Sequence, residues 1–203
     1  MNRNNIYMGQ QPTILEEIKF KAVGVDIFSR LMKDRIIFLG NEIDDELANI
    51  VTAQLLWLNT IDKKEPIQMY INSPGGFVHS GLQIYDTMQL IKAPVYTICI
   101  GNASSMAAIL LSGGKKGYRG ILPHAKVMIH QPMGGMRGQA SDMDIAATQI
   151  KKIKNELYDI LSNNTGKSME QIIKDADRDY WMDAKEAVEY GIVDKVFDGK
   201  NIL

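Results

Sequence analysis

The chain has 203 residues, of which 45% are hydrophobic and 23% are charged, and these values fit one soluble globular domain with or without a short appendage. Its net charge of −1 provides no electrostatic attraction for nucleic acid or an anionic membrane surface, and its single cysteine, Cys99, excludes an internal disulfide. No apolar run approaches the roughly 18 residues of a membrane span, and the polar first residues lack the pattern of a secretory signal, so we expect a cytoplasmic protein.

The beginning of the chain has no strong periodicity. Residues 1–22 are predicted to be a flexible N-terminal arm or a segment that is removed, and residues 23–203 a single domain. Beyond the arm, short apolar strands alternate with helical patterns. Strands are expected over 35–39, 67–71, 95–100, 127–129 and 192–197, and helices over 44–62, 80–91, 106–111, 141–163 and 183–190, with a further helix after Ser168.

This alternation predicts an α/β fold with a parallel sheet. In such a sheet, functional loops lie at the carboxyl ends of the strands. Two turns rich in small residues occupy such places, Pro74-Gly75-Gly76 after one strand and Ser104-Ser105 after the next. Their expected position at one edge of the sheet favours a catalytic site there.

The second of these turns joins a strand directly to a helix. Such a turn exposes the side chain at its apex and points free backbone N–H groups at the space in front of it, which suits a nucleophile. Ala103 and Ala107, which flank Ser105, are small, as the residues beside the serine of a nucleophile elbow must be. The alternative is that Ser104 and Ser105 only cap the helix.

A serine nucleophile needs a base, and the base needs an orienting acid. Of the three histidines, His79, His124 and His130, only the last lies at the end of a predicted strand; its alternative is a structural histidine. The spacing selects no acid among the candidates, which are Asp142, Asp144, Asp175, Asp177, Asp179 and Asp183. Backbone N–H groups of the Gly75-Gly76 turn and of Met106 could bind an oxyanion, although an ordinary tight turn would look the same.

The pattern over 141–163 predicts the longest helix of the chain. Its apolar residues are spaced by four and three positions in turn: Ala146, Ile150, Ile153, Leu157 and Ile160. The stripe is narrow, like a coiled-coil seam, and the helix would be about 34 Å long at 1.5 Å per residue. Because a small domain cannot cover such a length, we expect the stripe to contact another subunit.

Four separate motifs occur in the order Tyr70-Ile71-Asn72-Ser73-Pro74-Gly75-Gly76, Gly101-Asn102-Ala103-Ser104-Ser105-Met106, Met128-Ile129-His130-Gln131-Pro132, and Arg178-Asp179 with Glu186-Ala187-Val188-Glu189-Tyr190-Gly191. Together they resemble the ClpP endopeptidases, the proteolytic subunits of the ATP-dependent Clp proteases. The resemblance covers the chain from about Asp26 to Phe197. It implies the ββα-superhelix that this family shares with crotonases, with a protruding handle helix over about 134–163, in which 134–138 would form a strand.

The resemblance implies a role for each candidate side chain. Ser105 would be the nucleophile, His130 the general base and Asp179 the orienting acid. Backbone N–H groups of Gly76 and Met106 would form the oxyanion hole. The neighbouring pair Asp177 and Arg178 would couple contact between rings to the geometry of the triad.

The resemblance also implies partners. Two seven-membered rings of this chain would stack into a homo-oligomeric tetradecamer around a closed chamber. Unfolded protein substrates would be fed in by an AAA+ Clp ATPase such as ClpX, ClpA or ClpC. We expect no cofactor and no metal, because ATP would be hydrolysed by that partner and this chain has no G-x-x-x-x-G-K-[ST] motif.

The sequence departs from the family pattern at the nucleophile. The motif usually reads Gly-Gln-Ala-Ala-Ser-Met-Gly, and here Asn102, Ser104 and Ala107 replace three of its members. Two other functions are considered. One is a non-catalytic structural subunit of a mixed ring, which would have lost members of the triad. The other is a crotonase-like acyl-CoA enzyme, which would not need Ser105 and His130 as a pair.

Overall fold

The computed structural model describes residues 13–18, 21–135 and 138–198, and it confirms a mixed α/β fold. The strands in these residues are β1 (Thr13–Ile18), β2 (Lys21–Asp26), β3 (Ile36–Leu39), β4 (Ile67–Ser73), β5 (Val95–Ser104), β6 (Arg119–Ile121), β7 (Lys126–Ile129), β8 (Tyr180–Met182) and β9 (Lys195–Val196). The helices are α1 (Ile27–Lys33), α2 (Asp45–Ile61), α3 (Val78–Leu90), α4 (Met106–Ser112), α5 (Ala140–Thr165), α6 (Met169–Asp175) and α7 (Ala184–Tyr190).

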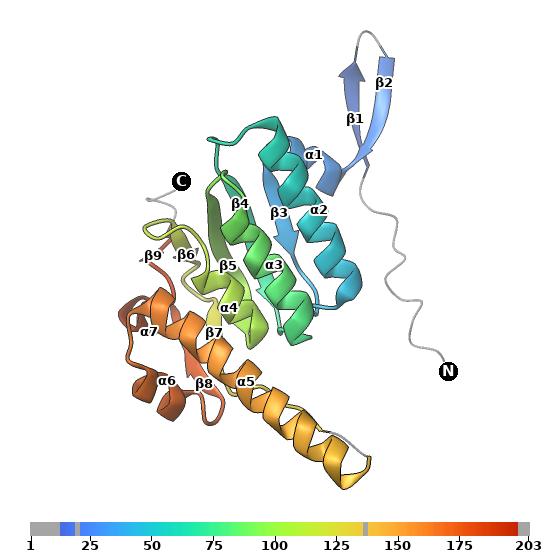
Figure 1. Cartoon of the computed structure of the whole chain (residues 1–203). Coiled ribbons are helices and arrows are strands. Elements are labelled where there is room, and N and C mark those ends of the chain that lie inside the picture. Colours follow the sequence, from blue (N-terminus) through green and yellow to red (C-terminus); the bar gives the residue numbers. More distant parts are fainter. Residues whose placement is uncertain (1–12, 19–20, 136–137, 199–203) are drawn as a thin grey trace, which may run out of the picture.

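The predicted parallel sheet is present. Its main path has the order β3-β4-β5-β6-β9, and each neighbouring pair in this path is parallel. Helices α2, α3 and α4 lie side by side along one face of it (Figure 1). The short strands β6 and β8 were not anticipated from the sequence, because three residues are too few to show a periodicity.

The sequence forms these elements for ordinary reasons. Helix α2 begins at Asp44, whose side chain accepts a hydrogen bond of 2.8 Å from the backbone N–H of Leu47. Its buried residues recur at helical spacing and form one apolar face: Ala48, Val51, Leu55 and Leu58. That face packs into the core beside the alternate residues Ile67, Met69 and Ile71 of β4, which are fully buried.

Strand β5 pairs with β4 along one edge and with two strands in succession along the other edge. Its first half pairs with β6, where Cys99 lies opposite Ile121, and its second half pairs with β7, where Asn102 lies opposite Lys126. Between these halves its register with β4 shifts. The strand that leads to Ser105 is therefore redirected from one neighbour to the other. Cys99 itself is fully buried, and burial raises the pKa of its thiol to about 11, which fits a packing role.

Helix α5 projects from the body of the domain (Figure 1). The expectation that its whole apolar stripe contacts another subunit is wrong for the C-terminal half. Leu157 is buried in the core of its own domain, and Ile153 and Ile160 pack against that core. The projecting half carries Met143 and Ile145, which are exposed. The packed half anchors the helix, while Met143 and Ile145 on the projecting half are not covered by the described residues.

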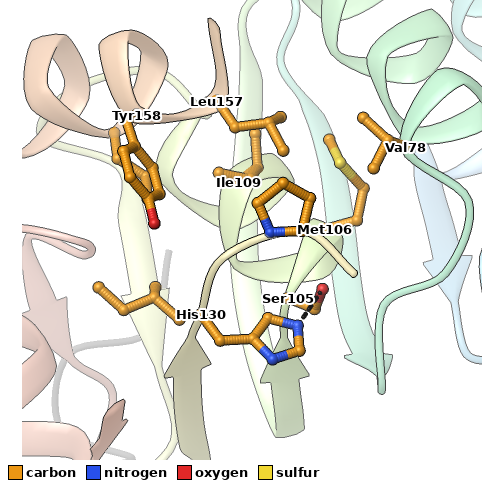
Figure 2. A pocket seen from close by; sticks show the side chains of 10 residues that line it. Val78, Ser105, Met106, Ile109, His130, Leu157 and Tyr158 are labelled. Atoms are coloured by element: carbon orange, nitrogen blue, oxygen red, sulfur yellow. Dashed lines mark hydrogen bonds between the residues drawn. The ribbon is translucent and has the colours of Figure 1, made fainter. Parts of the chain in front are cut away.

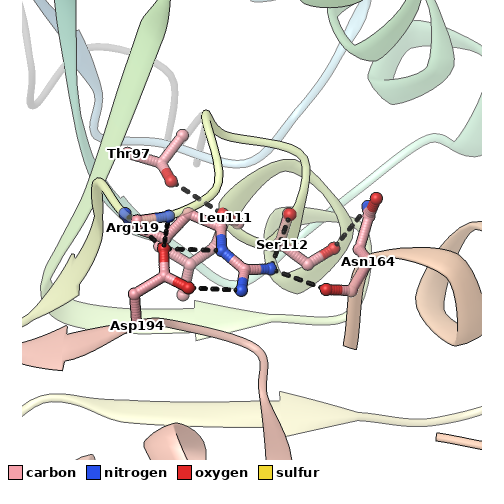
Figure 3. Close-up of polar contacts among 7 residues, drawn as sticks. Thr97, Leu111, Ser112, Arg119, Asn164 and Asp194 are labelled. Carbon is pink, nitrogen blue, oxygen red and sulfur yellow. Dashed lines mark hydrogen bonds and ion pairs between the residues drawn. The ribbon is translucent and has the colours of Figure 1, made fainter. Parts of the chain in front are cut away.

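A buried ion pair holds the base of this arrangement together. The Arg119 guanidinium bonds both carboxylate oxygens of Asp194, the shorter contact being 2.7 Å. It also donates to the carbonyls of Ser112, at the end of α4, and Asn164, at the end of α5 (Figure 3). The ends of two helices and the loop before β9 therefore meet at one side chain.

The N-terminal arm and the segment before α5 differ from their predictions. Part of the predicted N-terminal arm forms an antiparallel pair, β1 with β2, while residues 1–12 and 19–20 lie outside the described residues. The strand expected over 134–138 is not seen at Gly134 and Gly135, which lie in irregular structure, and residues 136–137 lie outside the described residues. Among the described residues, no helix is both long and apolar enough to cross a bilayer.

Candidate active site

Ser105 lies in the sharp turn between β5 and α4. Its backbone has φ 55° and ψ −123°, and among the described residues other than glycine only Arg35 also has a positive φ. Such a conformation is strained and is typical of a nucleophile elbow, which presents the serine side chain. The side chain of Ser105 makes no capping hydrogen bond to α4, and the Ser104 hydroxyl bonds Asn102 instead. The interpretation of these serines as helix caps is therefore wrong.

Strand β7 brings His130 to this turn. Ser104 pairs with Met128, and the N–H of Ser105 donates a 2.8 Å hydrogen bond to the Met128 carbonyl. Two residues further on, Nε2 of His130 lies 2.9 Å from Oγ of Ser105. Figure 2 shows the His130 ring turned toward the Ser105 hydroxyl.

The antiparallel pairing of β7 with β8 brings in the carboxylate. Ile129 lies opposite Tyr180, so the same register puts His130 opposite Asp179. Nδ1 of His130 is 3.0 Å from Oδ1 of Asp179. The three side chains form one continuous chain of hydrogen bonds, in which His130 can accept the Ser105 proton at Nε2 while Nδ1–H donates to the carboxylate.

The other candidate bases and acids lie elsewhere. His79 and His124 are exposed and lie outside this hydrogen-bond chain. Asp142 and Asp144 are on the projecting half of α5, Asp175 accepts hydrogen bonds from Tyr190 and Gln171, and Asp183 caps α7. The backbone N–H of Glu186 is the main reason that the pKa of Asp183 is below its ordinary value.

Asp177 and Arg178 are both exposed and lie directly before Asp179. Within the described part of the chain they form no ion pair with each other. The Asp177 carbonyl accepts a 2.8 Å hydrogen bond from the Gln131 side chain, which in turn accepts one of 2.9 Å from Lys154 of α5. The predicted role of Asp177 and Arg178, which is to couple contact between rings to the geometry of the triad, involves a second chain and stays a prediction.

The glycine turn lies directly beside the serine. A Cβ on Gly75 would come within 2.7 Å of the Ser105 Cβ and 3.0 Å of the Met106 nitrogen. Gly76 has φ +154°, and its neighbours Gly75 and Phe77 bond the backbone of Ile43, so its own N–H points away from Ile43. Within the described residues, neither the N–H of Gly76 nor that of Met106 has an acceptor. These amides are thus available to an anion.

A small apolar pocket opens beside the serine and the histidine. Side chains of α3, α4 and α5 line it, among them Val78, Ile109, Leu157 and Tyr158 (Figure 2). Burial and the nearby charge of Asp177 raise the pKa of Tyr158 above its ordinary value, so its hydroxyl stays neutral. The apolar stripe predicts a subunit contact for Leu157 and no role for Tyr158, because a helical stripe does not show which part of it faces a site.

Comparison with known proteins identifies the family. The family model described as Clp protease matches residues 20–200. This chain belongs to the Clp protease family. Among curated proteins it is 57% identical over 187 residues to an ATP-dependent Clp protease proteolytic subunit of Porphyromonas gingivalis, which covers 92% of this chain and 84% of that protein.

Two further Clp protease proteolytic subunits are similar over almost the whole chain. That of Bacteroides fragilis is 57% identical over 185 residues, covering 91% of this chain and 89% of that protein. Subunit 1 of Salinibacter ruber is 50% identical over 194 residues, covering 96% and 83%. The family and the Clp-type serine endopeptidase activity predicted from the four motifs are confirmed, and a non-catalytic subunit is not favoured.

Proposed function

We propose that this Clp-family endopeptidase cuts peptide bonds with Ser105 as nucleophile, His130 as general base and Asp179 as the orienting acid. Oγ of Ser105 attacks the peptide carbonyl carbon while its proton moves to Nε2 of His130. The C–N bond then breaks, and the imidazolium returns that proton to the departing amine. In the second half of the reaction, water attacks the acyl-enzyme while His130 takes its proton. His130 then returns this proton to Oγ of Ser105, which frees the serine.

The negatively charged oxygen that forms in each attack needs hydrogen-bond donors, placed away from His130. We assign them to the backbone N–H groups of Gly76 and Met106, which lack acceptors in the described residues: Met106 follows Ser105, and Gly76 follows Gly75, which lies against Ser105. Two such amides stabilise the tetrahedral intermediate more than the flat carbonyl, and this difference accelerates the reaction.

The assembly and the substrates are part of the same proposal. The relatives are named as proteolytic subunits of ATP-dependent proteases. We therefore propose that this chain forms a tetradecamer of two stacked seven-membered rings and degrades unfolded proteins supplied by an AAA+ Clp ATPase such as ClpX, ClpA or ClpC. We further propose that it acts in the cytoplasm and itself uses no cofactor or metal.

The observation that carries this proposal is the hydrogen-bond chain from Ser105 through His130 to Asp179. The test is hydrolysis of a short fluorogenic peptide by the assembled protein without any ATPase. Ser105→Ala removes the nucleophile, so the rate should fall by about 10³-fold or more. Ser80→Ala is the control: the Ser80 hydroxyl donates to Asp45 and is not part of the triad, so the rate of hydrolysis should equal that of wild type. Equal hydrolysis by wild type and Ser105→Ala would contradict the proposal.

A further inference from the structure

The strand that leads to the nucleophile contains a break in its pairing. Ile71 of β4 lies opposite Cys99 of β5, but Ser73 lies opposite Ala103. Between these two pairs β4 advances by two residues and β5 by four. Such a bulge bends a strand and interrupts the backbone hydrogen bonds of the sheet. At this point β5 also leaves β6 and joins β7. The position of Ser105 relative to His130 therefore depends on how this bulge is held.

Side chains replace the missing backbone bonds at the bulge. Oδ1 of Asn72 accepts a 3.0 Å hydrogen bond from the backbone N–H of Asn102. In return, Nδ2 of Asn102 donates across to the Ser73 carbonyl over 3.4 Å. Gly101 leaves room for this exchange, because a Cβ there would lie 2.5 Å from Oδ1 of Asn72.

The same contacts continue to both sides of the reacting centre. The Ser104 side chain is 3% exposed, and its hydroxyl donates a 2.8 Å hydrogen bond to Oδ1 of Asn102. On the other strand, Oγ of Ser73 accepts a 3.1 Å hydrogen bond from the N–H of Gly75. Gly75 in turn lies against Ser105. Asn102 thus links the residue before the nucleophile to the glycine turn that faces it.

We propose that Asn102 and Ser104 act together as positioning residues, which set the place of Ser105 relative to the Gly75-Gly76 amides. The proposal rests on the proposed function of Ser105. A buried hydroxyl needs a partner, and Asn102 is the acceptor for Ser104, so the two residues depend on each other. Asn102 and Ser104 therefore form a matched pair beside the nucleophile.

The test is a double-mutant cycle of Asn102→Gln, Ser104→Ala and the double variant, measured as kcat and KM for a short fluorogenic peptide. Asn102→Gln moves the amide and leaves the Ser104 hydroxyl without its acceptor, so kcat should fall about tenfold. Ser104→Ala should lower kcat about threefold, because Asn102 loses one hydrogen bond. In the double variant the buried hydroxyl is gone, and kcat should recover to within about threefold of wild type. KM should change less than twofold throughout.

A merely structural role would give a different result. Ser80→Ala also removes a buried serine hydroxyl that bonds a side-chain oxygen, at 2.6 Å, but its partner is Asp45 of α2 and neither residue bonds the bulge. It should lower the melting temperature and leave kcat unchanged. The proposal is overturned if Asn102→Gln and Ser104→Ala, like Ser80→Ala, lower the melting temperature and leave kcat unchanged. It is also overturned if their separate effects on kcat multiply in the double variant.

The failure of this inference can be separated from failure of the proposed function. Reaction of the wild-type serine with a fluorophosphonate is measured on the same samples. A wild-type protein that reacts at Ser105, together with variants that keep full kcat, overturns only the role of Asn102 and Ser104. A wild-type protein that does not react overturns both. Ser104→Ala decides the question if Asn102→Gln does not assemble, because alanine fits the space of serine.

Discussion

At the scale of single residues, the hydrogen bond between His130 and Asp179 decides which ring nitrogen faces Ser105. The carboxylate accepts from Nδ1, so Nε2 is left to take the serine proton. Asp179→Asn can donate to Nδ1 and would favour the wrong tautomer. We therefore predict that kcat for a short peptide falls about 10³-fold or more, with little change in melting temperature.

The matched control for this prediction is Asp86→Asn. Asp86 is an exposed carboxylate on α3 outside the site, and its replacement changes the charge of the chain by the same amount. Its kcat should equal that of wild type. Retention of more than a tenth of wild-type activity by Asp179→Asn would show that His130 is oriented by something else.

At the scale of elements, the pair of Arg119 and Asp194 joins β6 to the ends of α4 and α5 (Figure 3). Burial raises the pKa of Asp194, but the hydrogen bonds and the charge of Arg119, together with the N–H of Gly117, lower it by more in total, so the net pKa in the folded chain is below its ordinary value. Asp194→Asn leaves the Arg119 cation, which is 3% exposed, buried without its carboxylate. We predict that the free energy of unfolding falls by about 3 kcal/mol at pH 7.

The pH dependence of this difference follows from the direction of the pKa shift. Stabilisation by ionised Asp194 is complete above the pKa of an unfolded aspartate, about 3.9, and is lost as the pH falls through the lower folded value. Urea unfolding at equal protein concentrations should show wild type and Asp194→Asn converging below about pH 4. Asp34→Asn, which breaks the exposed pair with Arg30, should cost less than about 0.5 kcal/mol. A pH-independent difference would contradict this account.

At the scale of the whole molecule, the projecting half of α5 carries apolar side chains that its own domain does not cover (Figure 1). Met143 is 44% exposed and Ile145 is 65% exposed. Burial of such side chains against another copy would stabilise the proposed rings. We predict that Ile145→Glu weakens self-association by about tenfold or more for each contact, because burial of one isoleucine contributes about 1.5–3 kcal/mol.

Native mass spectrometry across a dilution series measures this effect. Wild type should remain in the proposed tetradecamer at concentrations where Ile145→Glu has dissociated into smaller species. Ala147→Glu adds the same charge at an exposed position on the opposite side of the same helix and should assemble like wild type. If both variants assemble equally well, the projecting half of α5 is not the contact.

Much of the fold could be predicted, because periodic patterns are local. The buried alternation of β4 and the apolar face of α2 are visible in the sequence. The alternation of strands with helices predicts a parallel sheet, and the carboxyl ends of its strands place Ser105 and His130 at one edge. The length of β8 and its register with β7 are not local properties. They alone put Asp179 opposite His130, so spacing could not distinguish Asp179 from the other aspartates.

Other features escaped prediction for related reasons. The bulge in β5 lies within a continuous run of strand-forming and small residues, and nothing in that run shows where the strand changes neighbours. The stripe of α5 has the same spacing where it packs on its own domain as where it projects. The pair β1 and β2 has polar and charged residues in its strands and gave no clear alternation.

The most direct measurement of the central claim is mass spectrometry of the assembled wild-type protein after reaction with a fluorophosphonate. In the proposed mechanism the strained turn, the His130 base and the neighbouring amides activate one hydroxyl, so one adduct per chain should form and digestion should map it to Ser105. Ser105→Ala should remain unmodified, although Ser104 is still present. An adduct on Ser104, or no adduct on wild type in a fully assembled tetradecamer, would contradict the account.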